Sequence, residues 1–262
     1  MDLATILGVV VALIIVFVVQ ILEGGNPASI ILIPSMVLVF GGAFCAAMAG
    51  GVLKDALGAG GLLKKAFAPK VIPPNVLVDD IVKLAERARR EGLLALEDAV
   101  KTVEHPFLKR GLQLAIDGTD PEELHDILHA EVGAKKKADK AGKKIFENMG
   151  GYAPTIGIIG TVMGLVHVLE NLDKPETLGH SIAAAFVATL WGVLSANVIF
   201  LPIAARLDRL SGLEADEMDL VIDGVLAIQA GSNPRLVAQK LRSLLPPDAA
   251  KAADAAGSKK AA

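Results

Sequence analysis

Four long stretches of the chain contain no Asp, Glu, Lys or Arg, although these residues make up 21% of its 262 residues. The stretches run from Leu3 to Leu22, Ser29 to Leu53, Gly151 to Leu169 and Ser181 to Ala205. A helix of about 20 residues rises roughly 30 Å, which is the thickness of the hydrocarbon core of a bilayer. The sequence therefore predicts four transmembrane helices, and it excludes both an ordinary soluble enzyme and a disordered chain.

The first stretch has a competing interpretation as a cleaved secretory signal peptide. No basic residue precedes it, and Glu23-Gly24-Gly25-Asn26 does not resemble the small-residue site at which such peptides are cut. We therefore expect this span to be retained.

The basic residues lie almost entirely in two segments of the chain. Of the 26 Lys and Arg residues, 17 lie between Lys54 and Lys144 and 8 between Arg206 and Lys260, whereas only Lys174 lies in a short loop between spans. Basic residues close to transmembrane helices remain in the cytoplasm. We expect a multi-pass protein of the cytoplasmic (inner) membrane with both termini inside the cell.

The region between the second and third spans shows helical periodicity and no alternating strand pattern. A helical face is predicted between Val76 and Val103, with a break near Gly92. Thr119-Asp120-Pro121-Glu122 has the pattern of a capping box, so a helix should begin there and could run into the third span. Residues 51–70 should lie along the membrane surface, and residues 207–245 should be helical up to Pro246-Pro247.

The predicted fold is an all-α integral membrane protein with a large helical cytoplasmic loop between spans two and three and a cytoplasmic C-terminal helix. The organisation is residues 1–53 for spans one and two, 54–148 for a cytoplasmic region, 149–205 for spans three and four, 206–247 for the C-terminal helix, and 248–262 for a disordered tail.

Several kinds of chemistry find no support in the sequence. The net charge of −3 argues against a nucleic-acid partner, and the single Cys45 excludes a multi-thiolate metal site. His125 and His129 have an i, i+4 spacing, and His105 is the other histidine of this region. The sequence specifies no third ligand for them, so no metal site is expected there. No nucleophile with its base is apparent, so neither an enzyme nor a bound cofactor is expected.

An ion path through a membrane usually contains a carboxylate, and none of the four spans has one. Either the chain conducts nothing, or the ion-binding acid belongs to another polypeptide. Small and hydroxyl residues do follow helical stripes: Pro154, Gly157, Thr161 and Gly164 in span three, and Ala185, Thr189, Gly192 and Ala196 in span four. Such stripes either pack ordinary helices closely or line a path in which the hydroxyls meet a cation.

The cytoplasmic segment from Arg89 and Arg90 to Glu97 carries opposite charges on what the pattern predicts as two short helices. A solvated surface is the simpler interpretation of these charges.

Motifs of one known family lie at residues 1–5, 89–97, 151–169, 178–183, 188–192, 223–229 and 233–235. Through them much of the chain resembles the MotA/PomA/MotP family of flagellar stator subunits. It implies a pentameric ring around the membrane helices of a MotB/PomB/MotS-like dimer, whose Asp binds the ion. It also implies a role in motility and chemotaxis, in which ion flow drives ring rotation and torque on the rotor.

The resemblance assigns roles to particular residues. Pro154 and Pro202 match the family's prolines in spans three and four, so an ion path facing the partner helix would involve the six stripe residues Pro154, Gly157, Thr161, Gly164, Thr189 and Gly192 together with Pro202. Arg89 and Glu97, with Arg90 beside them, match the charged residues that engage the rotor protein FliG.

The transported cation is predicted from Thr161 and Thr189. Members of the sodium type have threonine at these positions, and hydroxyl oxygens suit a partly dehydrated sodium ion. Sodium is therefore favoured, with transient binding at the two threonines, and a proton-driven MotA type is the alternative. An ExbB/TolQ-like energiser has similar last spans but three spans in all, whereas a self-sufficient transporter and a purely structural scaffold are rivals of other classes.

Overall fold

The computed structural model describes residues 4–69, 73–173 and 175–245, and all regular elements within them are helical. In chain order they are α1 (Ala4–Leu22), η1 (Pro27–Ile30), α2 (Ile33–Met36), η2 (Val37–Gly41), α3 (Gly42–Ala49), α4 (Leu53–Phe67), α5 (Pro74–Glu91), η3 (Leu93–Ala95), α6 (Leu96–Thr102), α7 (Pro106–Ile116), α8 (Pro121–Glu170), α9 (Pro175–Leu194), η4 (Ser195–Phe200), α10 (Leu201–Gln229) and α11 (Pro234–Ser243). The predicted tail 248–262 lies outside the described residues.

Four helical stretches are long and apolar enough to cross a membrane. They are Ala4–Leu22, Pro27–Ala49, Pro121–Glu170 and Leu178–Gln229. The predicted all-α fold with four spans is confirmed, and α8 continues without a break from the charged sequence that begins at Pro121 into the third span.

The chain divides into two compact units. The first, called here the membrane unit, contains residues 1–69 and 138–210, and the second, called the bundle unit, contains residues 70–137 and 211–262. The predicted cytoplasmic region 54–148 is therefore divided between the two units. The divisions within α8 and α10 fall at Lys137–Ala138 and Leu210–Ser211.

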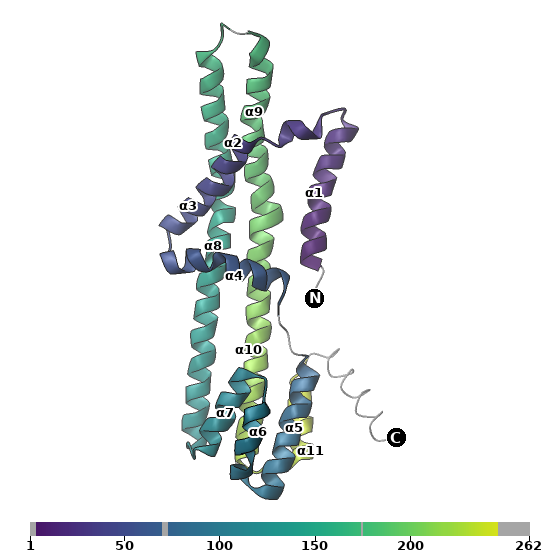
Figure 1. Cartoon of the computed structure of the whole chain (residues 1–262), viewed down its shortest axis with the longest axis vertical. Coiled ribbons are helices and arrows are strands. Elements are labelled where there is room, and N and C mark those ends of the chain that lie inside the picture. Colours follow the sequence, from purple (N-terminus) through teal and green to yellow (C-terminus); the bar gives the residue numbers. More distant parts are fainter. Residues whose placement is uncertain (1–3, 70–72, 174, 246–262) are drawn as a thin grey trace. The chain divides into compact units, whose positions relative to one another are not determined.

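In the membrane unit, α8 and α9 run side by side, and α4 crosses α8 (Figure 1). The second span is irregular, because a 3-10 turn, a short α-helix and the π-helical turn η2 precede α3. Trp191 of α9 holds this irregular part by donating from Nε1 to the carbonyl oxygen of Ile30, 2.6 Å away. The ring of Phe40 packs between those of Trp191 and Phe200, with centroid distances of 6.0 and 5.7 Å.

In the bundle unit, the apolar face predicted for residues 76–103 is buried as expected. Its buried residues on α5 are Leu77, Val78, Ile81, Leu84, Ala85 and Ala88, and on α6 they are Leu96 and Val100. Gly92 has φ +87° and separates the two helices, which explains why the sequence places a glycine at this break.

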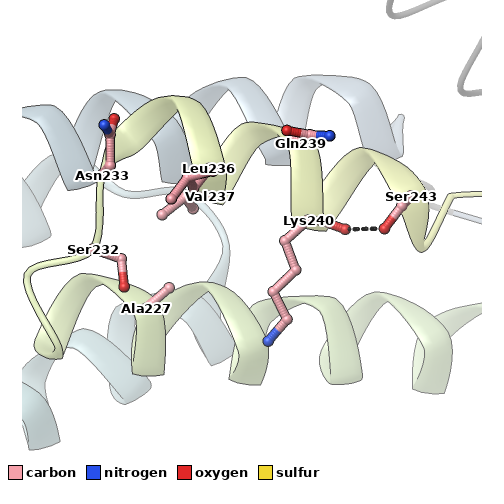
Figure 2. A pocket seen from close by; sticks show the side chains of 8 residues that line it. All are labelled: Ala227, Ser232, Asn233, Leu236, Val237, Gln239, Lys240 and Ser243. Atoms are coloured by element: carbon pink, nitrogen blue, oxygen red, sulfur yellow. Dashed lines mark hydrogen bonds between the residues drawn. The ribbon is translucent and has the colours of Figure 1, made fainter.

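The structure corrects two details of the predicted helices. Helix α8 begins at Pro121, within the predicted capping box, but its cap is Asp120 and not Thr119, because Oδ1 of Asp120 accepts from the amide of Glu122 at 2.9 Å. Residues 207–245 are not one helix, because Gly231, with φ +63°, ends α10 and Asn233 caps α11. A groove of about 620 Å³ lies at this turn, lined by side chains of α10 and α11 (Figure 2).

Candidate functional site

The helices α8 and α9 approach each other at two glycines until their backbones touch. A Cβ atom on Gly157 would lie 2.8 Å from the carbonyl oxygen of Ala188 and 3.1 Å from the Cα of Gly192. A Cβ atom on Gly192 would lie 2.7 Å from the carbonyl oxygen of Ala153. Only glycine fits at these positions, because the obstructing atoms are backbone and cannot rotate away.

The close contact continues towards the other end of the stripe. A Cβ atom on Gly164 would lie 2.6 Å from the Cβ of Ala185. Gly160, which the predicted stripe does not include, belongs to the same contact, since a Cβ atom there would lie 2.7 Å from Ala188 and 2.8 Å from Leu38. The signal that could have found Gly160 is its place between Gly157 and Gly164 on the same side of the helix.

Two threonine hydroxyls meet within this contact. The Oγ1 atoms of Thr161 and Thr189 are 2.5 Å apart. The Oγ1 of Thr161 is 3.2 Å from the carbonyl oxygen of Gly157 and 3.1 Å from that of Ala185. The Oγ1 of Thr189 is also 3.2 Å from the carbonyl oxygen of Gly157. The structure thus brings four oxygen atoms of two helices together. The sequence had placed Thr161 and Thr189 on two separate stripes and could not show that they meet.

The two hydroxyl groups have only two protons for these four oxygen–oxygen contacts. Each hydroxyl donates one hydrogen bond and keeps two lone pairs as acceptors. A cation or water that reaches the cluster therefore meets oxygen lone pairs that the protein does not fully use.

The two predicted prolines lie in different places. Pro154 is half-buried beside the closest approach of the helices, where a Cβ atom on Gly192 would lie 3.3 Å from its Cα. Pro202 is also half-buried, but it lines a separate groove of about 400 Å³. Residues of α1 line one wall of this groove, and Asn197 and Pro202 belong to the other wall. Six of the seven predicted residues are therefore brought together, and Pro202 is not.

The other faces of α8 and α9 in the membrane unit are apolar and exposed. Large exposed side chains include Ile159, Met163, Phe186 and Val193. In a bilayer such faces contact lipid, a neighbouring subunit or a partner helix. None of these faces offers a carboxylate, because the spans contain none.

Charged residues lie on α8 and α10 beyond one end of this contact. Lys143 donates to Oδ1 of Asp208 at 2.7 Å, and this bond raises the pKa of Lys143 above its usual value. Burial raises the pKa of Glu147, but hydrogen bonds from Lys144 and Lys143 outweigh it, so that the pKa lies below its usual value. Both shifts favour the charged forms of Lys143 and Glu147, so these two side chains cannot act as a neutral extension of the spans.

In the bundle unit, the predicted rotor residues Arg89, Arg90 and Glu97 are all exposed. The arginines lie in the last turn of α5 and Glu97 in the first turn of α6, where their charges also complement the helix dipoles.

The charged neighbours of these three residues pair with each other. Arg87 pairs with Glu91 at 3.2 Å and Lys101 with Asp98 at 2.8 Å. The same hydrogen bond lowers the pKa of Asp98 and raises that of Lys101. Within the described residues Arg89, Arg90 and Glu97 take part in no ion pair. Their charges are therefore available to an external partner.

Fold and site together define a class of protein: a multi-pass helical membrane subunit with a hydroxyl-lined, charge-free contact between two spans and a charged surface on its extramembrane helices. A family model described as "MotA/TolQ/ExbB proton channel family" matches residues 99–220. The chain is 36% identical to "Motility protein A" of Bacillus subtilis (strain 168), over 94% of this chain and 92% of that protein. It is 34% identical to "Chemotaxis protein PomA" of Vibrio alginolyticus, over 94% of this chain and 96% of that protein.

A solved structure titled "Structure of C. jejuni MotAB" is similar in fold. It superposes with a TM-score of 0.89 at 32% identity, over 95% of this chain and 97% of that chain. The chain belongs to the MotA/PomA family of flagellar stator subunits, within the wider MotA/TolQ/ExbB family. It is therefore a multi-pass inner-membrane protein of a family of channel-type proteins, not of enzymes.

We expect Gly157→Ala to lower the stability of the purified chain by about 1 to 3 kcal/mol, because the new methyl group must push two backbones apart. The midpoint of thermal unfolding in detergent measures this change. Gly151→Ala is the matched control, since a Cβ atom there would have no neighbour within 4 Å. Better helix propensity should then stabilise the control by up to about 1 kcal/mol. Equal midpoints for the two variants would contradict the close contact of α8 and α9.

Proposed function

We propose that this chain forms a pentameric ring around a MotB/PomB/MotS-like dimer and that cations flow along the boundary between ring and partner. The ion flow turns the ring, and the ring turns the flagellar rotor. The observation that carries this proposal is the absence of any carboxylate from the four charge-free spans, two of which share a hydroxyl cluster. A cation that crosses the membrane needs a negative charge to hold it, so the acid must come from a second polypeptide.

The mechanism follows from the cost of a charge beside apolar helices. An ionised aspartate on the partner faces a large desolvation cost against the apolar surfaces of the ring. Binding of a cation neutralises the acid and removes this cost, so the ring can step relative to the partner. A membrane potential of 100 mV supplies about 2.3 kcal/mol per charge, which is enough to bias a step but not to unfold a subunit.

Sodium is the cation that the hydroxyl cluster favours. Sodium is a hard cation that binds oxygen ligands, and Thr161 and Thr189 bring two hydroxyl oxygens next to the carbonyl oxygens of Gly157 and Ala185. A proton moves along water chains and needs no such ligands. A proton-driven stator of the MotA type is the alternative, and the description of the matching family as a proton channel family favours it.

The charged surface of the bundle unit is proposed to transmit torque. Arg89, Arg90 and Glu97 remain exposed while their charged neighbours pair with each other, which suits transient contacts with the rotor protein FliG. Exposed charge pairs are weak, typically below about 1 kcal/mol, so they can form and break at each step. This proposal includes a cytoplasmic position for the surface and for both chain termini, which the basic residues near the spans support.

An energiser of the ExbB/TolQ type is the second candidate. It shares the wider family, but four candidate spans and the nearly full-length similarity to Motility protein A and PomA favour the flagellar role.

Thr161→Ala and Thr189→Ala should each raise the sodium concentration needed for half-maximal swimming by at least about tenfold. The reason is that an interaction between a neutral oxygen and a charged group contributes about 1.5 to 3 kcal/mol. The variants are produced with the native partner in cells that lack other stators, and swimming speed is measured against sodium concentration. Thr155→Ala is the control, because this hydroxyl also bonds a carbonyl of its own helix, 2.8 Å away on Tyr152, but lies outside the cluster. Unchanged sodium dependence in both test variants would favour the proton-driven alternative.

Charge reversal by Arg89→Glu or Glu97→Arg should reduce motor torque while the amount of chain in the membrane stays the same. Like charges then face each other across the rotor contact, and a compensating reversal on the rotor protein should restore torque. Torque is measured from the rotation of tethered cells. Lys136→Glu, an exposed reversal on α8, is the control. Normal torque in both test variants would refute the rotor role.

A further inference from the structure

The exposed face of helix α4 consists of leucine, lysine and glycine residues. We call the residues Leu53, Lys54, Leu57, Gly58, Gly61 and Lys64 the outer face of α4. The opposite face is docked on the membrane unit, since Ala56 and Ala66 are only 4% and 2% exposed. The docking is close, because a Cβ atom on Gly142 of α8 would lie 2.7 Å from the side chain of Leu62.

Lys65 lies beside the outer face, because eleven residues separate it from Lys54 and place the two lysines about 20° apart around the helix. The Nζ of Lys65 lies 3.3 Å from Oδ1 of Asp139 on α8, so its charge is used within the membrane unit and it is not counted in the outer face. The docked side of α4 is set by Ala56, Leu62 and Ala66, which lie on the opposite side of the helix.

The outer face combines apolar and positively charged side chains. Leu53 and Leu57 are 61% and 77% exposed. Lys54 and Lys64 are exposed and form no ion pair with any other described residue. The only acid of the helix, Asp55, is half-buried and lies towards the docked side. The charge on this face is thus entirely positive.

The position of α4 places this face at the edge of a bilayer. The second span ends at Ala49, and α4 begins after only three more residues. The parts of the membrane unit that adjoin the spans on this side, residues 53–69, 138–148 and 206–210, contain eight basic and four acidic residues. The whole chain has a net charge of −3, so this excess of positive charge is local.

We propose that the outer face of α4 is a binding surface for anionic phospholipid, with Leu53 and Leu57 inserted among the acyl chains and Lys54 and Lys64 contacting the phosphate headgroups. An amphipathic helix with leucines flanked by lysines binds membranes in this way. The three glycines of this side, Gly58, Gly60 and Gly61, leave the backbone open to headgroups, since a Cβ atom on any of them would have no neighbour within 4 Å. Lipid binding at this face depends on the charge of the headgroup and does not depend on which cation the stator carries.

The test uses the full-length chain with Cys45→Ala and a bimane label on Gly61→Cys, reconstituted with its partner in bilayers. Quenching of the label by brominated phosphatidylglycerol and by brominated phosphatidylcholine gives the relative association constant of the two lipids at this face. We expect phosphatidylglycerol to be preferred. Lys54→Gln and Lys64→Gln should each reduce the preference about fivefold, which corresponds to about 1 kcal/mol for each lysine near an anionic surface. Leu57→Gln should weaken quenching by both lipids alike.

Three controls test whether the lipid preference belongs to the outer face of α4. Lys109→Gln with Lys137→Gln removes two exposed lysines of the bundle unit and should leave the preference unchanged. A label on Gly133→Cys in the bundle unit, where a Cβ atom also has no neighbour within 4 Å, should not be quenched by either lipid. Millimolar glycerol phosphate should not compete with the lipid.

Three results would overturn the proposal: equal quenching by the two lipids, competition by free glycerol phosphate, or no quenching at Gly61→Cys. The last result would mean that a second copy of the chain covers the face. Sodium-dependent swimming tests the proposed stator function separately, so either hypothesis can fail while the other stands.

Discussion

The structure depends on the direct backbone contact between α8 and α9. At Gly157 and Gly192 the two helices lie so close that neither position can hold a Cβ atom. This approach places the hydroxyls of Thr161 and Thr189 against each other and against backbone carbonyls. Lipid supplies no hydrophobic force between helices, so close packing and interhelical hydrogen bonds must hold such a pair together. The same contact therefore stabilises the spans and gathers the polar atoms of the candidate ion path.

The contact also limits what the chain does by itself. The hydroxyl and carbonyl oxygens can coordinate a passing cation, but they cannot neutralise its charge in a medium of low dielectric constant. A subunit with this arrangement needs a carboxylate from elsewhere, and the exposed apolar faces of α8 and α9 have room for another helix. The proposed need for a second polypeptide agrees with the membership of the MotA/PomA family, since the similar solved structure is named "Structure of C. jejuni MotAB".

The sequence predicted the parts of the fold that depend on composition and periodicity. Charge-free stretches revealed the four spans, and the 3.6-residue repeat of Leu77, Ile81 and Leu84 revealed the buried face of α5. Local backbone choices were less predictable. The use of Asp120 instead of Thr119 as a cap and the turn at Gly231 depend on small differences between competing local hydrogen bonds. The π-helical turns η2 and η4 have no sequence signature of this kind. For the site, spacing aligned the two small-residue stripes, but only tertiary packing shows that Thr161 meets Thr189 and that Pro202 lies in another groove.

The proposed cation path requires an acid that none of the four spans of this chain contains. The most direct measurement is cation flux into proteoliposomes that hold either the chain alone or the chain with its co-purified partner, under an imposed membrane potential. We expect no flux above that of empty liposomes for the chain alone, and a flux with the partner that is lost when the partner's membrane aspartate becomes asparagine. A cation current carried by the chain alone would contradict this requirement.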